Sequence, residues 1–277
     1  MDAIANIVAF FEQPIAVPEP WNGYHAIWLL LLTASLLCLV YAAPNLRSNP
    51  SLTRGITRGL GLFLLCIEVL KQIFGGLHAA EGTVYWQYPW YMFPLQLCST
   101  PLYICALLPF ARGSVARPMQ MYLGTFGMLG GIAVMLFPQS VFCDYLFLNL
   151  HTMLWHSGLI LLGATQWLSG NMRGNFGEYC GATCIFLIFA AIAAALNFAF
   201  PQLAGKGFDL FYISPYISPG TLGSIEEMRK ALPYPIYFTG YLAALCTGAA
   251  LLFAAMRSLV RPDDAAEELK RAKPFSE

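Results

Sequence analysis

The stretch Tyr179–Phe200, YCGATCIFLIFAAIAAALNFAF, contains no charged residue and decides the class of fold. A helix needs about 20 mostly apolar residues to cross the hydrocarbon layer of a membrane, and this stretch is long enough. Apolar side chains make up 58% of the 277 residues and charged ones 11%, whereas soluble domains average about 25% charged residues. The chain is therefore predicted to be an all-α integral membrane protein.

Seven segments in total have the length and composition of membrane-spanning helices, and we expect them to form one seven-helix membrane domain over residues 1–277. Residues 4–11 are expected to lie along the membrane surface. Within the long connection 201–233, Ser224-Ile225-Glu226-Glu227 is a capping-box pattern and predicts the start of a short helix. The seven segments run approximately over residues 25–43, 56–75, 91–110, 118–137, 148–168, 179–200 and 234–256.

The orientation is predicted from lysine and arginine, which accumulate in cytoplasmic connections. The N-terminal segment and the second and fourth connections are taken to be poor in these residues. The N-terminus is therefore expected outside, with residues 257–277 as a cytoplasmic tail, and we expect the membrane to be a bacterial cytoplasmic membrane. The arginines and lysines that mark the cytoplasmic ends are Arg47, Arg54, Arg58, Arg112, Arg117, Arg173, Arg257, Arg261, Lys270, Arg271 and Lys273.

Charge and cysteine usage restrict the class of partner. Fifteen basic and fifteen acidic residues cancel, so no nucleic-acid partner is expected, and a membrane lipid is the expected substrate. Most of the eight cysteines fall within apolar segments, and only Cys143 falls in a connection. No structural disulfide, metal site or cofactor is therefore predicted.

Ionisable and polar groups inside the segments are costly and indicate function. Glu68, Cys98, His156 and Tyr241 each lie about two turns below the predicted outer end of their helices. Glu68 and Lys71 are spaced to form a pair within one helix, and His156 can also be read as an ordinary core histidine. Further polar residues near this level are Gln72, Gln96, Asn149 and Thr152.

Two prolines, Pro94 and Pro101, flank Cys98. A proline inside a helix removes a backbone hydrogen bond and bends the helix, so the helix should open near Cys98. Freed carbonyls at this depth require partners.

A cysteine and a histidine at one level predict acyl transfer. A thiol in a low-dielectric site needs a base to ionise, and His156 is the predicted base for Cys98. Glu68 is expected to orient the imidazole, while Gln96, Asn149 or Tyr241 would hold the developing oxyanion.

Three stretches resemble the YwaF-like integral membrane proteins: Tyr91–Ser99 (YMFPLQLCS), Glu68–Gln72 (EVLKQ) and Leu150–Gly158 (LHTMLWHSG). Animal relatives of that family are described as acyltransferases that remodel phospholipids, and the family looks distantly similar to the androgen-induced membrane hydrolases of fatty-acid esters. The resemblance implies that Cys98 and His156 are the catalytic pair. The sequence departs from the family at Gln96, where many relatives have histidine, and in the order His156-Ser157-Gly158.

The predicted function is therefore an intramembrane acyltransferase or lipid esterase. One alternative is a transporter or channel in which Glu68, Lys71 and His156 form a polar path. Another is a metal-dependent hydrolase built from His78, Asp144, His151 and His156. It is disfavoured because His151 and His156 point about 140° apart on a helix.

Overall fold

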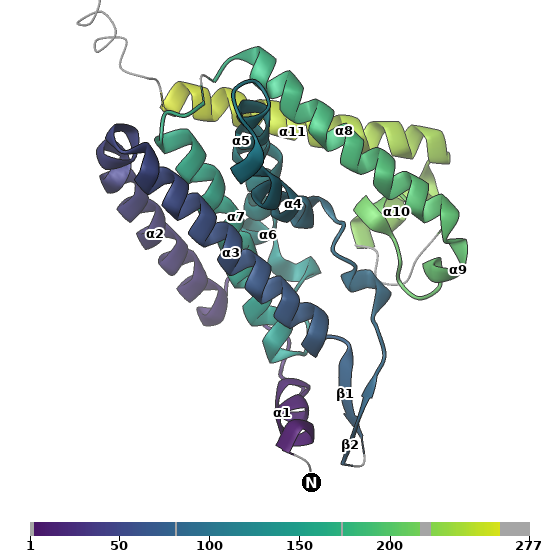
Figure 1. Ribbon diagram of the computed structural model, residues 1–277. Coiled ribbons are helices and arrows are strands. Elements are labelled where there is room, and N and C mark those ends of the chain that lie inside the picture. Colours follow the sequence, from purple (N-terminus) through teal and green to yellow (C-terminus); the bar gives the residue numbers. More distant parts are fainter. Residues whose placement is uncertain (1–2, 81, 173, 217–222, 261–277) are drawn as a thin grey trace, which may run out of the picture.

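The structure, a computed structural model, describes residues 3–80, 82–172, 174–216 and 223–260, and it is mostly helical (Figure 1). Three long helices, α2, α3 and α7, lie side by side, and α8 and α11 lie beside each other. The α-helices are α1 (Ala3–Phe11), α2 (Gly23–Ser48), α3 (Pro50–Phe74), α4 (Thr100–Leu107), α5 (Ala116–Tyr122), α6 (Met128–Leu136), α7 (Leu146–Leu168), α8 (Phe176–Ala199), α9 (Pro201–Ala204), α10 (Gly223–Ala231) and α11 (Tyr234–Leu259).

Asparagine side chains cap the N-termini of three of the long helices. The amide oxygen accepts hydrogen bonds from backbone N–H groups that have no partner within the first turn. Asn22 Oδ1 accepts a hydrogen bond from the His25 N–H at the start of α2. Asn49 does the same for Ser51 and Leu52, with Pro50 in the first turn of α3. Asn175 caps α8 through the Glu178 N–H.

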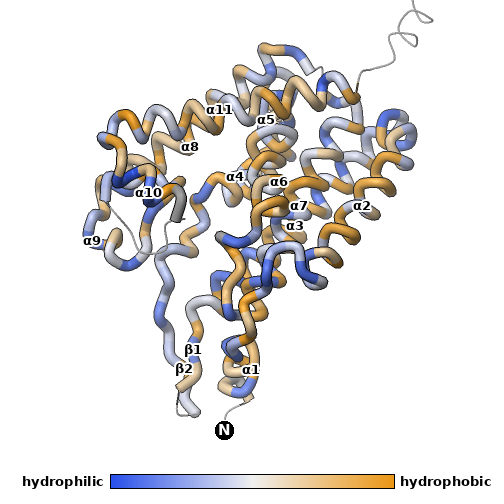
Figure 2. The backbone as a smooth tube through the Cα atoms, turned by 180° about the vertical axis from the view of Figure 1, so that it is seen from behind, coloured by the Kyte–Doolittle hydropathy of each residue, from blue (hydrophilic) through white to orange (hydrophobic). Residues whose placement is uncertain are grey.

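Five helical segments within the described residues are long and apolar enough to cross a membrane: Gly23–Ser48, Ala116–Leu136, Leu146–Leu168, Phe176–Ala199 and Tyr234–Leu259. Apolar residues predominate along α2 and over much of α8 and α11 in Figure 2. Length and composition therefore support five membrane-spanning helices and do not confirm seven. The second predicted segment forms the full-length helix α3, but that helix carries Arg54, Arg58, Glu68 and Lys71.

The third predicted segment, residues 91–110, is broken rather than continuous. It consists of short 3-10 turns η1 (Trp90–Met92), η2 (Leu97–Ser99) and η3 (Leu108–Phe110) around α4. The apolar helical part, Leu97–Phe110, is too short to span a membrane by the same measure. The interruption near Cys98 that the two prolines predicted is thus present.

The core is centred on α7, which packs against α2, α3 and α6 and buries Met153, Trp155 and Leu159. Glycines allow α6 and the preceding π-helical turn η4 (Leu123–Gly127) to approach it closely. A methyl group added to Gly124 would lie 2.8 Å from Nε1 of Trp167.

A β-hairpin of β1 (Leu77–Ala80) and β2 (Thr83–Trp86) follows α3 and was not predicted. It lies beside α1 at one end of the molecule (Figure 1). Glu12 at the end of α1 accepts hydrogen bonds from Nδ1 of His78 (2.6 Å) and the Ala79 N–H (2.7 Å). The N-terminal chain is also tied to the α6–α7 connection, because the Ile15 N–H donates to the Asp144 carbonyl.

The connection 201–233 contains α9, a 3-10 turn η6 (Leu210–Tyr212) and α10. Helix α10 includes the predicted capping-box residues. Most of the predicted cytoplasmic tail, residues 261–277, lies outside the described residues.

Candidate functional site

The break in the third segment places Cys98 in η2, where three carbonyls that helix geometry leaves free are satisfied by side chains. The hydroxyl of Tyr103 donates to Pro94 O (2.6 Å), and that of Thr100 donates to Leu97 O (2.7 Å). The Trp155 indole N–H donates to the carbonyl of Cys98 itself at 3.0 Å. Because the opened backbone is held by α4 and α7, Cys98 has a defined position on a non-helical turn.

His156 is buried on α7, and its hydrogen bonding defines which tautomer is present. Its Nδ1 lies 2.7 Å from the Thr152 carbonyl oxygen, and a carbonyl only accepts, so Nδ1 carries the hydrogen. In the neutral imidazole Nε2 then presents a lone pair, as a general base requires. Nε2 is buried and has no hydrogen-bond partner among the described residues.

Helix α6 packs against both Cys98 and His156. A methyl group added to Gly130 would lie 3.6 Å from Cβ of Cys98, and one added to Gly131 would lie 2.8 Å from the carbonyl oxygen of His156. Trp155, the neighbour of His156, binds Cys98 O. The two predicted catalytic residues therefore lie around one stretch of α6, although no hydrogen bond joins their side chains within the described part of the chain.

Glu68 is the centre of a buried charged cluster on α3. Its Oε1 accepts from Lys71 Nζ at 2.8 Å and from Gln72 Nε2 at 2.7 Å. Its Oε2 faces Nε2 of His151 at 3.5 Å, which is long for a hydrogen bond. The carboxylate therefore faces His151 and not His156, the ring that it was predicted to orient. The Thr152 carbonyl holds the His156 ring instead.

The cluster continues to the surface through Gln72. The Gln72 amide also donates to Met92 O (2.8 Å), and its oxygen accepts from the Tyr88 hydroxyl (2.6 Å). Gln72 thereby connects the Glu68 carboxylate to the chain between the hairpin and η1.

Two of the residues predicted to hold an oxyanion are committed to structural bonds. Gln96 donates to Asp209 O (2.8 Å) and accepts from the Phe211 N–H (2.7 Å), which fixes the η6 turn where Phe211 has φ 57°. Asn149 exchanges hydrogen bonds with the backbone of Cys143. Their amides are therefore occupied, so Tyr241 and the backbone near Cys98 are the remaining candidate donors.

Tyr241, the third residue predicted to hold an oxyanion, stacks on Tyr237 with ring centroids 5.8 Å apart. The Tyr237 hydroxyl donates to the carbonyl of Tyr212 in η6. Asn197 pairs with both the N–H and the carbonyl of Leu210. Tyr237 and Asn197 thus both fix the η6 turn.

The sequence analysis did not identify the part that His151 and Trp155 have in this site, and it named His151 only for the metal-dependent alternative. They are four apart on α7, so they share a face, and their rings stack at 5.5 Å with an interplanar angle of 19°. That spacing was a usable signal. Among the described residues no three His, Cys, Asp or Glu side chains are grouped to hold a metal ion, and His78 of the metal hypothesis pairs with Glu12.

Comparison with known proteins gives one match. The sequence model of the TMEM164 family, a family of membrane proteins, covers residues 21–253, which include every residue of the site. No curated protein and no solved structure matches. The family match names neither the YwaF-like proteins nor an acyltransferase, so the activity implied by that resemblance stays a prediction.

Proposed function

This chain belongs to the TMEM164 family, and we propose that it is an intramembrane acyltransferase or lipid esterase that uses Cys98 as nucleophile and His156 as base. The observation that supports it most is the buried imidazole of His156. Its Nδ1 is fixed by Thr152, and its Nε2 is unpaired among the described residues. A buried nitrogen without a hydrogen-bond partner lowers the stability of the fold. A role as general base would explain why this one is present.

The reaction begins when Nε2 of His156 takes the thiol proton and Sγ of Cys98 attacks an ester carbonyl of a phospholipid. The tetrahedral intermediate collapses, the C–O bond of the ester breaks, and His156 returns the proton to the leaving lysolipid hydroxyl. A thioester remains on Cys98. An incoming lysophospholipid hydroxyl or water then loses its proton to Nε2, attacks the thioester and releases the thiol.

The proposal requires Sγ and Nε2 to come within hydrogen-bond reach in the substrate complex. Catalytic hydrogen bonds often tighten only when substrate is bound. The turn at η2 favours this, because Cys98 lies in a short 3-10 turn and not within a regular helix. Neighbouring N–H groups of that turn are the proposed oxyanion donors.

The proposed topology has seven crossings, with the N-terminus outside and the C-terminus in the cytoplasm of a bacterial cell. Helix α3 crosses because Glu68 and Lys71 neutralise each other at 2.8 Å and Arg54 and Arg58 lie in its first turns. The broken segment 91–110 forms the third crossing, with its irregular half covered by α7 and η6.

The experiment is phospholipid turnover by purified protein in liposomes that contain a labelled phospholipid and a lysophospholipid. Mass spectrometry of the products compares wild type, Cys98→Ala, His156→Ala and, as control, Cys66→Ala, which removes an exposed thiol on α3. Turnover that is lost in the first two variants and kept in the control supports the proposal, as does a hydroxylamine-sensitive acyl group on Cys98. Undiminished turnover in Cys98→Ala contradicts it.

Transport is a second candidate, because the buried chain from Glu68 through Gln72 to Tyr88 connects α3 with the loop after the hairpin. Lys71 and His156 would then carry charge along a polar path. Solute flux in liposomes without lipid turnover, surviving Cys98→Ala, would favour it. We rank it second because Lys71 and Gln72 hold Glu68 in a fixed pair through Oε1, whereas Nε2 of His156, unpaired among the described residues, is what a general base requires.

A further inference from the structure

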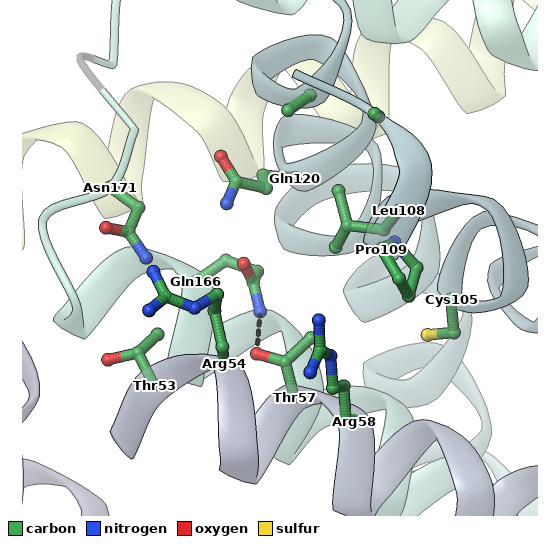
Figure 3. Close-up of a pocket in the computed structure, with 12 residues that line it drawn as sticks. Thr53, Arg54, Thr57, Arg58, Cys105, Leu108, Pro109, Gln120, Gln166 and Asn171 are labelled. Atoms are coloured by element: carbon green, nitrogen blue, oxygen red, sulfur yellow. Dashed lines mark hydrogen bonds between the residues drawn. The ribbon is translucent and has the colours of Figure 1, made fainter. Parts of the chain in front are cut away.

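A cavity lies at the end of the molecule where α3 begins. Its volume is about 160 Å³. The sides come from α3, from the chain around η3 and α5, and from the end of α7 (Figure 3). Arg54 and Glu68 are fourteen residues apart on α3, which is about 21 Å along a helix. The cavity is therefore separate from the charged cluster, and its binding chemistry does not depend on the proposed acyl transfer.

One wall of this cavity is rich in hydrogen-bond donors. Arg54 and Arg58 are four residues apart, so they extend from the same face of α3, and Figure 3 shows both guanidinium groups directed across the cavity. The amides of Gln120 and Asn171 also line it. The Gln166 amide donates to Thr57 Oγ1 at 2.9 Å and so holds α7 against α3 below the arginines.

The two arginines have no acidic partner within the part of the chain that the structure describes. Neither makes an ion pair or a side-chain hydrogen bond with any residue that the structure describes. The described parts of the surrounding segments, residues 44–58, 108–120 and 166–178, contain five arginines and one carboxylate, Glu178. The electrostatic field at this end therefore favours an anion.

The opposite wall is apolar and is formed by Cys105, Leu108 and Pro109. A polar wall that faces an apolar one suits a compact charged group next to a short apolar stem.

We propose that this cavity is a phosphate-binding site, in which Arg54 and Arg58 hold the phosphate oxygens and the apolar wall contacts the carbon atoms next to them. Guanidinium groups bind phosphate through two parallel N–H donors each, which gives both affinity and orientation. The phosphate comes either from the headgroup of a membrane phospholipid or from a soluble phosphate compound. Both sources share the same chemistry at the arginines.

The test measures binding to the full-length protein in detergent, with dihexanoyl phosphatidylglycerol as the lipid source and inorganic phosphate as the soluble one. The double variant R54Q/R58Q is compared with R112Q/R117Q, which removes the same charge at the same end but outside the cavity. Loss of charge-assisted hydrogen bonds predicts that R54Q/R58Q binds at least about tenfold more weakly. The control should change binding by less than about twofold.

Selective loss in R54Q/R58Q with phosphatidylglycerol supports a lipid source, and selective loss with inorganic phosphate supports a soluble one. Equal binding by wild type and R54Q/R58Q with both probes overturns the proposal, and so does an equal loss in the two double variants. If R54Q/R58Q does not fold, R54K/R58K decides the question, because it keeps the charge and loses the two-donor geometry. It should then bind more weakly than wild type, and equal binding would again overturn the site.

Discussion

Trp155 donates its indole N–H to the carbonyl oxygen of Cys98 across 3.0 Å and thereby fixes the opened turn η2 to α7. Trp167, three turns further along α7, makes the equivalent bond to Gly124 O at 2.8 Å. Two tryptophans of one helix thus hold two irregular segments in the same way. Only the segment bound by Trp155 contains the proposed nucleophile. The pair offers a matched comparison.

Trp155→Phe should lower lipid turnover strongly and the stability of the protein only moderately. It leaves the Cys98 carbonyl without its donor, at a cost of about 1–3 kcal/mol, and a small displacement of the thiol lowers turnover by about tenfold or more. Trp167→Phe should cost similar stability and retain turnover. Thermal unfolding and the phospholipid assay measure both quantities. An equal loss of turnover in the two variants would show that Trp155 acts through stability alone.

Glu68→Gln should destabilise the protein strongly, because it leaves the charge of Lys71 buried without a partner. Removing one member of a buried ion pair costs about 3–5 kcal/mol, which corresponds to roughly 10 °C in the midpoint of thermal unfolding. The double variant Glu68→Gln/Lys71→Met should recover much of that loss.

The control for this pair is Glu226→Gln, which breaks the exposed Glu226–Lys230 pair on α10. Surface pairs contribute about 0–1 kcal/mol, so the unfolding midpoint should hardly move. A double variant at Glu68 and Lys71 that is no more stable than Glu68→Gln would argue against the pairing as the source of stability.

Gly131→Ala should be destabilising, since the added methyl group would lie 2.8 Å from both the His156 carbonyl oxygen and Cγ1 of Ile160. Overpacking of this kind costs about 1–3 kcal/mol, and the shift of α6 relative to α7 should also lower turnover. Gly59→Ala on α3 meets nothing within 4 Å and should be neutral or stabilising by up to about 1 kcal/mol. Unfolding curves in which the two variants behave alike would contradict the close approach of α6 and α7.

Maleimide labelling of Cys143 tests the orientation of the protein in the membrane, and the labelling rate should depend on pH. Burial raises the pKa of its thiol, and only the thiolate reacts with maleimide. Labelling by a membrane-impermeant maleimide should therefore increase about tenfold per pH unit between about pH 7 and 9 and stay slower than that of a free thiol.

For the proposed topology this labelling occurs from outside intact cells. Cys143→Ser is the control that isolates the signal from the other seven cysteines. Labelling that requires permeabilised cells would reverse the orientation.

The sequence determined the long helices to within a few residues, because twenty or more consecutive apolar residues have one stable form in a membrane. Tyr179–Phe200 became α8 (Phe176–Ala199), and residues 234–256 became α11 (Tyr234–Leu259). It also determined the break near Cys98, because a proline lacks the N–H that a helix needs. These are local properties of the chain.

The tertiary structure decided which polar groups meet. Spacing along helices gave the common level of Glu68 and His156 but not the rotation of α3 relative to α7. That rotation turns the carboxylate towards His151 and leaves His156 to its own Thr152 carbonyl. Gln96 likewise became a support for η6 through contacts more than a hundred residues distant. Such pairings depend on how whole helices pack, and no periodicity within a single segment records that.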